Sequence, residues 1–307
     1  MHNLPKNEDL LVFGVVALRS SFKRAADELG VSAAYVSKRI AILENSLSVK
    51  LFHRTTRSVA LTDAGERVYA LSRGVLDSVE QLVAESAPGR EAVRGRMRIC
   101  SSFGFGRNHV APVISQMVRE HSELQVRFEV LDRLIDPGVE GFDLDIRIGN
   151  EIAPHLIAKL INHNTRLLCA APTYLARHGT PRRLGDLPGH NCIVIKERDH
   201  PFGLWNLTAP NGQEETVKVA GSLSTNNGEA AVQWAVDGHG ILLRSIWDVH
   251  PLLADGRLVH VLRGHTQPAH VWAVYPPELR NRLKIQVVVD FFRSHLQQRA
   301  ESFAKYV

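Results

Sequence analysis

The sequence is poor in cysteine and contains no long apolar run. Only three cysteines, Cys100, Cys169 and Cys192, occur among 307 residues, and none of them forms a Cys-x-x-Cys pair. An odd and widely spaced set argues against a disulfide framework, so we expect small core residues, with redox sensing as the alternative. No apolar stretch approaches the roughly 18 residues of a membrane span. Glu8 and Asp9 precede the first apolar run, unlike in a signal peptide. These features predict a reduced, cytoplasmic protein with no membrane partner.

A large excess of either charge is also missing. The net charge is +5, from 37 Lys and Arg against 32 Asp and Glu. Between residues 19 and 67, however, nine basic residues stand against five acidic ones. This local excess suits a polyanion such as nucleic acid, and a solvated charged surface is the plainer alternative. The length exceeds the roughly 150 residues expected of one domain, so we expect more than one.

Residues 22–29 and 33–47 predict two short helices joined by a tight turn. Gly30 supplies the turn and Ser32 can cap the second helix. An amphipathic helix over 8–18 precedes them. This is the layout of a DNA-reading helix-turn-helix. The second helix starts with small residues and then becomes basic, so it can enter a major groove and contact phosphates.

The segment after the helix-turn-helix predicts a wing and a long helix. Residues 50–61 are basic, β-prone and short enough for a hairpin. Thr62 can cap a helix that runs to about Ser86, before Ala87-Pro88-Gly89. Its apolar seam favours coiled-coil dimerisation, and packing onto its own domain is the alternative. The seam consists of Leu61, Ala64, Val68, Leu71, Val75 and Leu82.

From Arg94 onward, strand-like runs alternate with helical stretches, which indicates an α/β domain. The predicted strands are 97–100, 125–131, 144–148, 166–170, 192–195, 217–220, 241–243 and 270–275. The predicted helices are 108–120, 173–178, 227–237, 246–253 and 283–298.

Over essentially its full length the chain resembles the LysR-type transcriptional regulators. The N-terminal matches, with the same spacing, are Ser21-Phe22, Arg24-Ala25-Ala26, Leu29, Val31-Ser32, Val36-Ser37, Ile40, Leu43-Glu44, Leu51-Phe52, Arg54, Leu61-Thr62 and Gly65. A second set resembles one subgroup, which also carries an Arg-Thr-Thr-Arg wing, here Arg54–Arg57. This set is Leu168–Pro172, Tyr174-Leu175, His178-Gly179, Pro181, Asp186-Leu187 and His190–Ile193.

The resemblance implies an α/β fold overall, made of a winged helix-turn-helix and a two-lobed, periplasmic-binding-protein-like effector domain. The implied domains are 1–62 for DNA binding, 63–90 for a linker and dimerisation helix, and 91–307 for effector binding. Lobe I would combine about 94–162 with 268–307, and lobe II would span about 163–267. The implied partners are double-stranded promoter DNA with paired half-sites, a second copy of the chain in a homodimer or homotetramer, a small-molecule effector and RNA polymerase. No cofactor and no metal are expected.

Within the helix-turn-helix segment, Phe22 to Ala41, the start of the second helix is expected to meet bases. One departure from the family stands here, because Ala33 and Ala34 replace Gln followed by Pro or Ser. Alanine cannot hydrogen-bond a base edge but can touch a thymine methyl. Base reading would then shift to Tyr35, Ser37 and DNA shape. The expected DNA-contacting residues are Ser32, Ala33, Ala34, Tyr35, Ser37, Lys38, Arg39, His53, Arg54, Thr55 and Arg57. Lys38 and Arg39 would bind phosphates, with guanine as an alternative for Arg39 and an internal ion pair for Arg57.

The effector cleft is expected where polar loops follow strands. Ser101 and Ser102 lie between a strand and a helix, where hydroxyl and backbone N–H groups can bind an anion, and plain turn chemistry is the alternative. In the resembled family the corresponding loop contacts the effector, and Ser102 is the principal candidate. The other expected residues are Arg147, Phe202, Thr225 and Asn226. For Arg147 an ion pair with Asp145 or Asp143 is the alternative. Because these groups are mostly donors, we expect a small organic acid, such as a carboxylate, as the effector.

Other protein classes fit the sequence less well. Gly104-Phe-Gly106 is followed by His109 where a dinucleotide fingerprint needs Gly or Ala. His260, His265 and His270 recur every five residues, which is not one helical face. No nucleophile with an accompanying general base is apparent, so we expect no enzyme. A solute-binding protein would match residues 94–307 alone and would lack residues 1–90.

Overall fold

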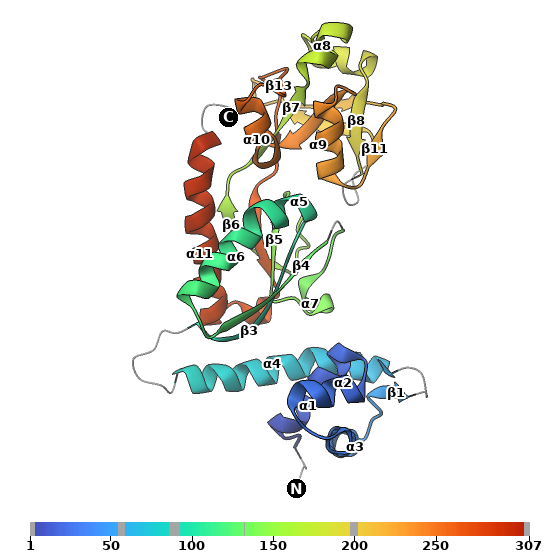
Figure 1. Cartoon of the computed structure of the whole chain (residues 1–307), viewed down its shortest axis with the longest axis vertical. Helices are drawn as coiled ribbons and strands as arrows, with labels where there is room; N and C mark the ends of the chain where they lie inside the picture. Colours follow the sequence, from blue (N-terminus) through green and yellow to red (C-terminus); the bar gives the residue numbers. More distant parts are fainter. Residues whose placement is uncertain (1–3, 55–58, 86–92, 132, 197–201, 304–307) are drawn as a thin grey trace. The chain divides into compact units, whose positions relative to one another are not determined.

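A computed structural model describes residues 4–54, 59–85, 93–131, 133–196 and 202–303 of the chain (Figure 1). The chain divides into two compact units, residues 1–92 and 93–307. Each unit has its own apolar core. None of the described helices is both long and apolar enough to cross a membrane.

The first unit begins with three helices whose ends follow local sequence signals. Gly30 closes the second helix at φ +66°, and the N–H of Val31 donates to the Ala26 carbonyl at 3.0 Å. Ser32 caps the third helix, because its Oγ accepts the Tyr35 N–H at 3.1 Å. The predicted turn and cap are therefore confirmed. The elements are α1 (Asn7–Arg19), α2 (Phe22–Leu29), α3 (Ala33–Leu47), β1 (Phe52–Arg54), β2 (Val59–Leu61) and α4 (Asp63–Glu85).

Side-chain hydrogen bonds connect these helices to the hairpin β1–β2. The Glu44 carboxylate is 3% exposed, and it accepts the Leu51 N–H at 3.0 Å and the Lys50 ammonium at 2.9 Å. Thr62 Oγ1 donates to the Lys50 carbonyl at 2.7 Å and accepts the Gly65 N–H at 2.9 Å. Both contacts fix the segment that leads from α3 into the hairpin and then into α4.

The predicted seam of α4 divides into two parts. Leu61 and Val68 pack against the core of their own unit, which includes Phe13. The later members of the seam are open: Leu71 is 73% exposed and Leu82 67%. Only the distal half of the helix therefore presents an uncovered apolar face.

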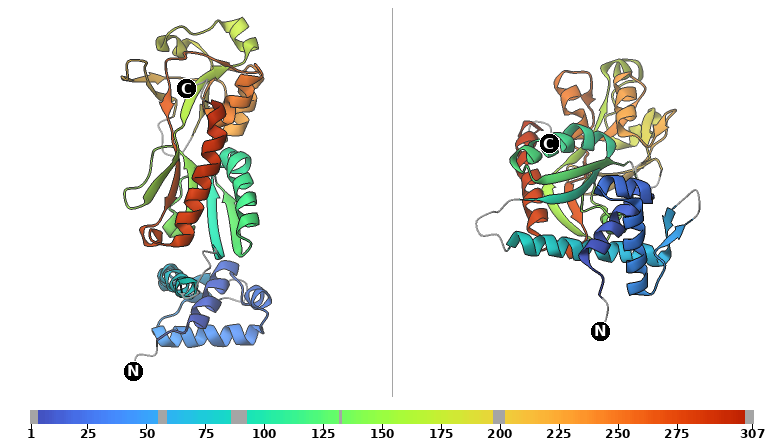
Figure 2. Two further views of the ribbon diagram at one scale, coloured as in Figure 1. Left: turned by 90° about the vertical axis from the view of Figure 1, so that its left-hand side faces the viewer. Right: turned by 60° about the horizontal axis from the view of Figure 1, so that its bottom comes forward.

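The second unit contains two sheets. The lobe I sheet has the order β4-β3-β5-β15-β6, with β3 parallel to β4 and β5, and with β15 antiparallel to both of its neighbours. The helices α6 and α11 lie side by side along this lobe (Figures 1 and 2). Its elements are β3 (Gly95–Ser101), α5 (Phe103–Phe105), a π-helical turn (Gly106–Val110), α6 (Ala111–Glu120), β4 (Leu124–Val130), α7 (Pro137–Glu140), β5 (Leu144–Ile148), β6 (Ile157–Asn162), β15 (Val271–Tyr275) and α11 (Leu283–Ala300).

The lobe II sheet has the order β11-β8-β12-β7-β13, and β14 pairs with β7. A hairpin, β9–β10, accompanies it. Its elements are β7 (Thr165–Ala170), α8 (Pro172–His178), β8 (Cys192–Ile195), β9 (Leu204–Thr208), β10 (Glu214–Lys218), β11 (Ser224–Thr225), α9 (Gly228–Val236), β12 (Ile241–Ser245), α10 (Ile246–Ala254), β13 (Val259–His260) and β14 (Gln267–Pro268).

Several strands differ from the sequence predictions. The run predicted at 217–220 lies within and beyond β10, which ends at Lys218. Strands β6, β9, β11, β13 and β14 were not predicted at all. β11, β13 and β14 are two-residue strands, too short to produce an alternating pattern. β6 is an edge strand of mixed polarity, so it also lacks a clear apolar run.

The chain passes between the two sheets at residues 163–164 and returns at 269–270. Asn164 joins the two passages: its N–H donates to His270 Nδ1 at 3.2 Å, and its carbonyl accepts the Ala269 N–H at 2.9 Å. The Asn164 side chain is buried and donates to the Ala269 carbonyl at 2.5 Å. It also accepts the Ser245 hydroxyl at 3.0 Å, so this contact links the passages to the start of α10.

Candidate DNA interface and ligand cleft

The start of α3 is an accessible surface of small side chains. Ser32, Ala33 and Ala34 are exposed, as is Lys38 one turn later, and Ser37 is half-buried. Because these side chains are short, another backbone can approach this helix end closely. Lys38 supplies a positive charge beside it.

Tyr35 and Arg39 have a different environment from the one predicted. The Tyr35 hydroxyl donates to Glu8 on α1, which raises the pKa of Tyr35. The Arg39 guanidinium is 14% exposed and forms ion pairs with Asp9 Oδ1 at 2.7 Å and Glu8 Oε2 at 3.0 Å. Arg39 is thus a partner of a buried carboxylate within the unit, and its contact with phosphate or guanine stays a prediction from the sequence. The Tyr35 hydroxyl is likewise engaged inside the unit.

The wing is described only in part. His53 is exposed on β1, opposite Ala60 of β2. Arg54 ends β1 and pairs with Val59, but its side chain lies outside the described residues, as do Thr55 and Arg57. Their expected contacts with DNA remain predictions from the sequence.

In the second unit, a cavity of about 60 Å³ lies where the two lobes meet. This space holds only a few water molecules. From lobe I it is lined by Ser102, which precedes α5. From lobe II it is lined by Asn226 and by Ser245, the cap of α10. The sequence-predicted residues Ser102 and Asn226 therefore line one cavity, although 124 positions separate them in the chain.

Helix N-termini and arginines bring positive charge to the wall of this cavity. α9 and α10 both begin at its wall, through Gly228 and Ser245, and a helix N-terminus carries partial positive charge. Arg133, Arg166 and Arg244 line it as well, with Asp248 as the acidic member. Sequence reasoning missed all three arginines, because each stands alone in a strand or loop without a motif.

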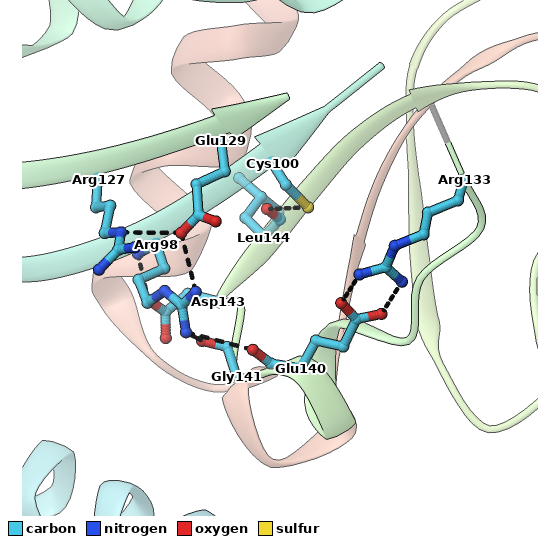
Figure 3. Close-up of polar contacts among 9 residues, drawn as sticks. All are labelled: Arg98, Cys100, Arg127, Glu129, Arg133, Glu140, Gly141, Asp143 and Leu144. Atoms are coloured by element: carbon cyan, nitrogen blue, oxygen red, sulfur yellow. Dashed lines mark hydrogen bonds and ion pairs between the residues drawn. The ribbon is translucent and has the colours of Figure 1, made fainter. Parts of the chain in front are cut away.

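Each of these arginines is held by a neighbour. Arg166 Nη1 donates to Gln267 Oε1 at 2.7 Å, and Arg244 Nε lies 2.8 Å from Asp248 Oδ2. Arg133 forms a forked pair with Glu140, with Nη1 at 2.6 Å from Oε1. Figure 3 shows this pair facing each other, beside a group in which Arg98 and Arg127 both contact Glu129 and Arg98 also donates to the Glu140 carbonyl. The cations are oriented rather than free to rotate.

The other predicted effector residues do not line this cavity. Ser101 is 3% exposed, and its hydroxyl donates to the Ile146 carbonyl at 2.6 Å within the sheet. Arg147 is 2% exposed and pairs with Asp145 at 2.6 Å, so the ion-pair alternative is the one observed. Thr225 Oγ1 accepts the Asn227 N–H at 3.0 Å. Phe202 is 59% exposed, outside the lining.

A polar contact links the two lobes near this cavity. Arg107, in the π-helical turn of lobe I, donates to Glu229 Oε1 on α9 of lobe II at 2.5 Å. Asn108 Nδ2 reaches the same oxygen at 3.4 Å. This contact joins the two lobes near the cavity, so it opposes their separation.

The three cysteines are buried, and burial shifts the pKa of each thiol. Burial raises the pKa of Cys169 and of Cys192 to about 12, and burial followed by Asp145 raises that of Cys100. Across the described part of the chain, no group of His, Cys, Asp and Glu side chains is arranged to hold a metal ion.

Comparisons with known proteins agree with both parts of the molecule. Residues 7–66 match the model of bacterial regulatory helix-turn-helix proteins of the lysR family, and residues 90–297 match the LysR substrate binding domain. The chain is 49% identical to the HTH-type transcriptional regulator DmlR of Escherichia coli K12, over 99% of each chain. It is 45% identical to the HTH-type transcriptional activator TtdR of the same strain, over 97% of this chain and 96% of TtdR. Among solved structures, CrgA of Neisseria meningitidis, a LysR-type transcriptional regulator, is similar at a TM-score of 0.59 and 25% identity, covering 94% of this chain and 98% of that one.

Proposed function

This chain belongs to the LysR family of helix-turn-helix transcriptional regulators, and on that premise we propose that a small organic acid, bound between its two lobes, switches its action on DNA. One observation carries the proposal: oriented guanidinium groups and the starts of α9 and α10 line one cavity between the lobes. A carboxylate is the ligand class that satisfies such a set of donors and positive ends. Within it, Ser102 and Asn226 supply neutral hydrogen-bonding groups from opposite lobes.

DNA binding is assigned to the exposed start of α3. Ser32, Ala33, Ala34 and Ser37 would face base edges, where methyl contacts and DNA shape replace amide hydrogen bonds. Lys38 would contact phosphate, and so would His53 and Arg54 on the wing. Phosphate contacts position the protein, whereas base contacts select the sequence.

We infer that two copies associate through the distal half of α4. Leu71, Val75 and Leu82 are 73%, 46% and 67% exposed, and their spacing of four and seven places them along one helix face. Burying this face against a second copy would remove it from water and present paired α3 helices to two half-sites, with a tetramer as a further assembly. RNA polymerase at the promoter is a further proposed partner. Because its proposed target is promoter DNA, the protein would act in the cytoplasm.

The switch would act through the relative positions of the lobes. A ligand that contacts both lobes stabilises one arrangement of the passages at residues 163–164 and 269–270 over others. The Arg107–Glu229 pair, which also spans the lobes, would shift the same equilibrium.

The proposal can be tested with purified full-length protein and the DNA upstream of its own gene. A gel-shift assay should show a specific complex, and calorimetric titration of a panel of small carboxylates should identify one that binds and alters that complex. Ser102→Ala should weaken binding of that acid, whereas Ser294→Ala on α11 should not. No DNA complex, or unchanged affinity of Ser102→Ala, would contradict the corresponding assignment.

A further inference from the structure

Arg244 occupies an unusual position at the edge of the effector cavity. It precedes the cap of α10, and its guanidinium lies against the first residue of α9, Gly228. A Cβ atom built on Gly228 would overlap this guanidinium, and even Nη1 would lie only 2.6 Å away. Real Cβ atoms essentially never approach another atom closer than 3.0 Å. Any other side chain at position 228 would therefore displace Arg244.

The backbone does not explain this glycine. Gly228 is not among the glycines with positive φ, so an alanine could adopt its conformation. Alanine would also favour the helix, because glycine is the weaker helix former. Asn227 already caps α9 by accepting the N–H groups of Glu229 and Ala230, both at 3.0 Å. What position 228 requires is space for the Arg244 guanidinium.

The placement is electrostatically costly unless anions offset it. Arg244 is a cation at the positive end of α9, where a second positive charge is repelled. Asp248, in the first turn of α10, offsets this repulsion because its Oδ2 lies 2.8 Å from Arg244 Nε. The two side chains are only 13% and 8% exposed, so water screens the charges weakly. A carboxylate in the adjoining cavity would be a further anion for this guanidinium.

We propose that Gly228 is a positioning residue of the effector site. Its missing side chain seats the Arg244 guanidinium between the start of α9 and Asp248, and so presents that guanidinium to a carboxylate in the cavity. The inference rests on the proposed function and deepens it, because it names the cation that meets the effector and the two residues that hold it.

Calorimetry on the full-length chain tests this, with oxalate as a small carboxylate probe. Gly228→Ala should weaken oxalate binding tenfold or more, as expected when a charged hydrogen bond is lost. Arg244→Gln should weaken it to a similar extent, and Gly228→Ala should cause no further loss in the Arg244→Gln background. Gly185→Ala is the matched control, because a Cβ at position 185 meets nothing within 4 Å; it should bind within twofold of the wild type.

This double-mutant cycle of Gly228→Ala and Arg244→Gln separates a positioning role of Gly228 from a general structural effect. Wild-type affinity in Gly228→Ala, or losses that multiply in the double variant, would overturn the inference. If thermal unfolding shows that Gly228→Ala does not fold, Arg244→Lys takes its place. Lysine keeps the charge but not the planar group seated against Gly228, so Arg244→Lys should lose as much oxalate affinity as Arg244→Gln, and wild-type affinity would overturn the inference. A wild-type chain that does not bind oxalate also overturns it. Conversely, the expected cycle without any response of the DNA complex to carboxylates would contradict the proposed function and leave the role of Gly228 intact.

Discussion

Replacing Arg39 by alanine should destabilise the first unit rather than only lower its affinity for DNA. Lys38 and Arg39 are adjacent basic residues on α3, and sequence alone gives them the same role. In the structure Lys38 is exposed, whereas Arg39 is paired with Asp9, whose side chain is 2% exposed. Arg39→Ala leaves that carboxylate buried without its cation. Lys38→Ala leaves no such group behind.

The size of the effect follows from the burial of Asp9. Removing one partner of a fully buried pair costs about 3–5 kcal/mol. Glu8, the second acid beside Arg39, is 54% exposed, so water reaches the edge of this cluster. We therefore expect a loss of about 2–3 kcal/mol, which lowers the melting temperature of a unit of this size by roughly 10–20 °C. Lys38→Ala should change the unfolding free energy by less than about 0.5 kcal/mol.

Calorimetric unfolding of the full-length variants measures the difference in stability between Arg39→Ala and Lys38→Ala. A salt titration of DNA binding then measures the effect of each variant on phosphate contacts. Lys38→Ala should lower the salt dependence of DNA binding by about one unit of log–log slope. Removing both partners, in Asp9→Ala with Arg39→Ala, should recover part of the lost stability, because no charge is then left buried. If Arg39→Ala melted like the wild type and reduced DNA binding as Lys38→Ala does, the structural role assigned to Arg39 would be refuted.

Four further predictions concern other parts of the chain. Arg54→Ala should weaken binding to specific and random DNA alike in a salt titration, and a loss confined to the specific site would contradict a phosphate contact. Burial, and then His163, lower the pKa of His270 below its ordinary 6.5. As the pH falls, the unfolded chain therefore protonates this histidine before the folded chain does. The corresponding stability is present above about pH 6.5 and lost as the pH falls, and His270→Gln should flatten that dependence of the melting temperature. Leu71→Glu should shift the chain toward monomer in sedimentation, and an unchanged mass would rule out the α4 face as the dimer contact. Cys169 should react with iodoacetamide at pH 8 only after unfolding, because burial raises its pKa to about 12.

Local signals account for much of the fold that the sequence predicted. The turn at Gly30 and the caps at Ser32 and Thr62 depend on residues within a few positions of each other, so they can be read directly. The lobe sheets were harder, because strands such as β11 and β14 hold only two residues and exist through their neighbours β8 and β7. Their pairing is set by parts of the chain far away in sequence.

The sequence by itself determined the helix-turn-helix, the alternation of strands and helices, and the family, since each depends on short-range spacing or on matched motifs. It also found Ser102 and Asn226, which mark a loop after a strand and a loop before a helix. Only the tertiary structure decided that Arg39 faces Asp9, because that pair joins residues 30 positions apart. Likewise, only folding brings Arg133, Arg166 and Arg244 to one cavity and leaves Gly228 as the space that one of them fills. Electrostatic and steric interactions depend on which residues are close in space. The sequence around a single arginine or glycine does not show which residues will contact it.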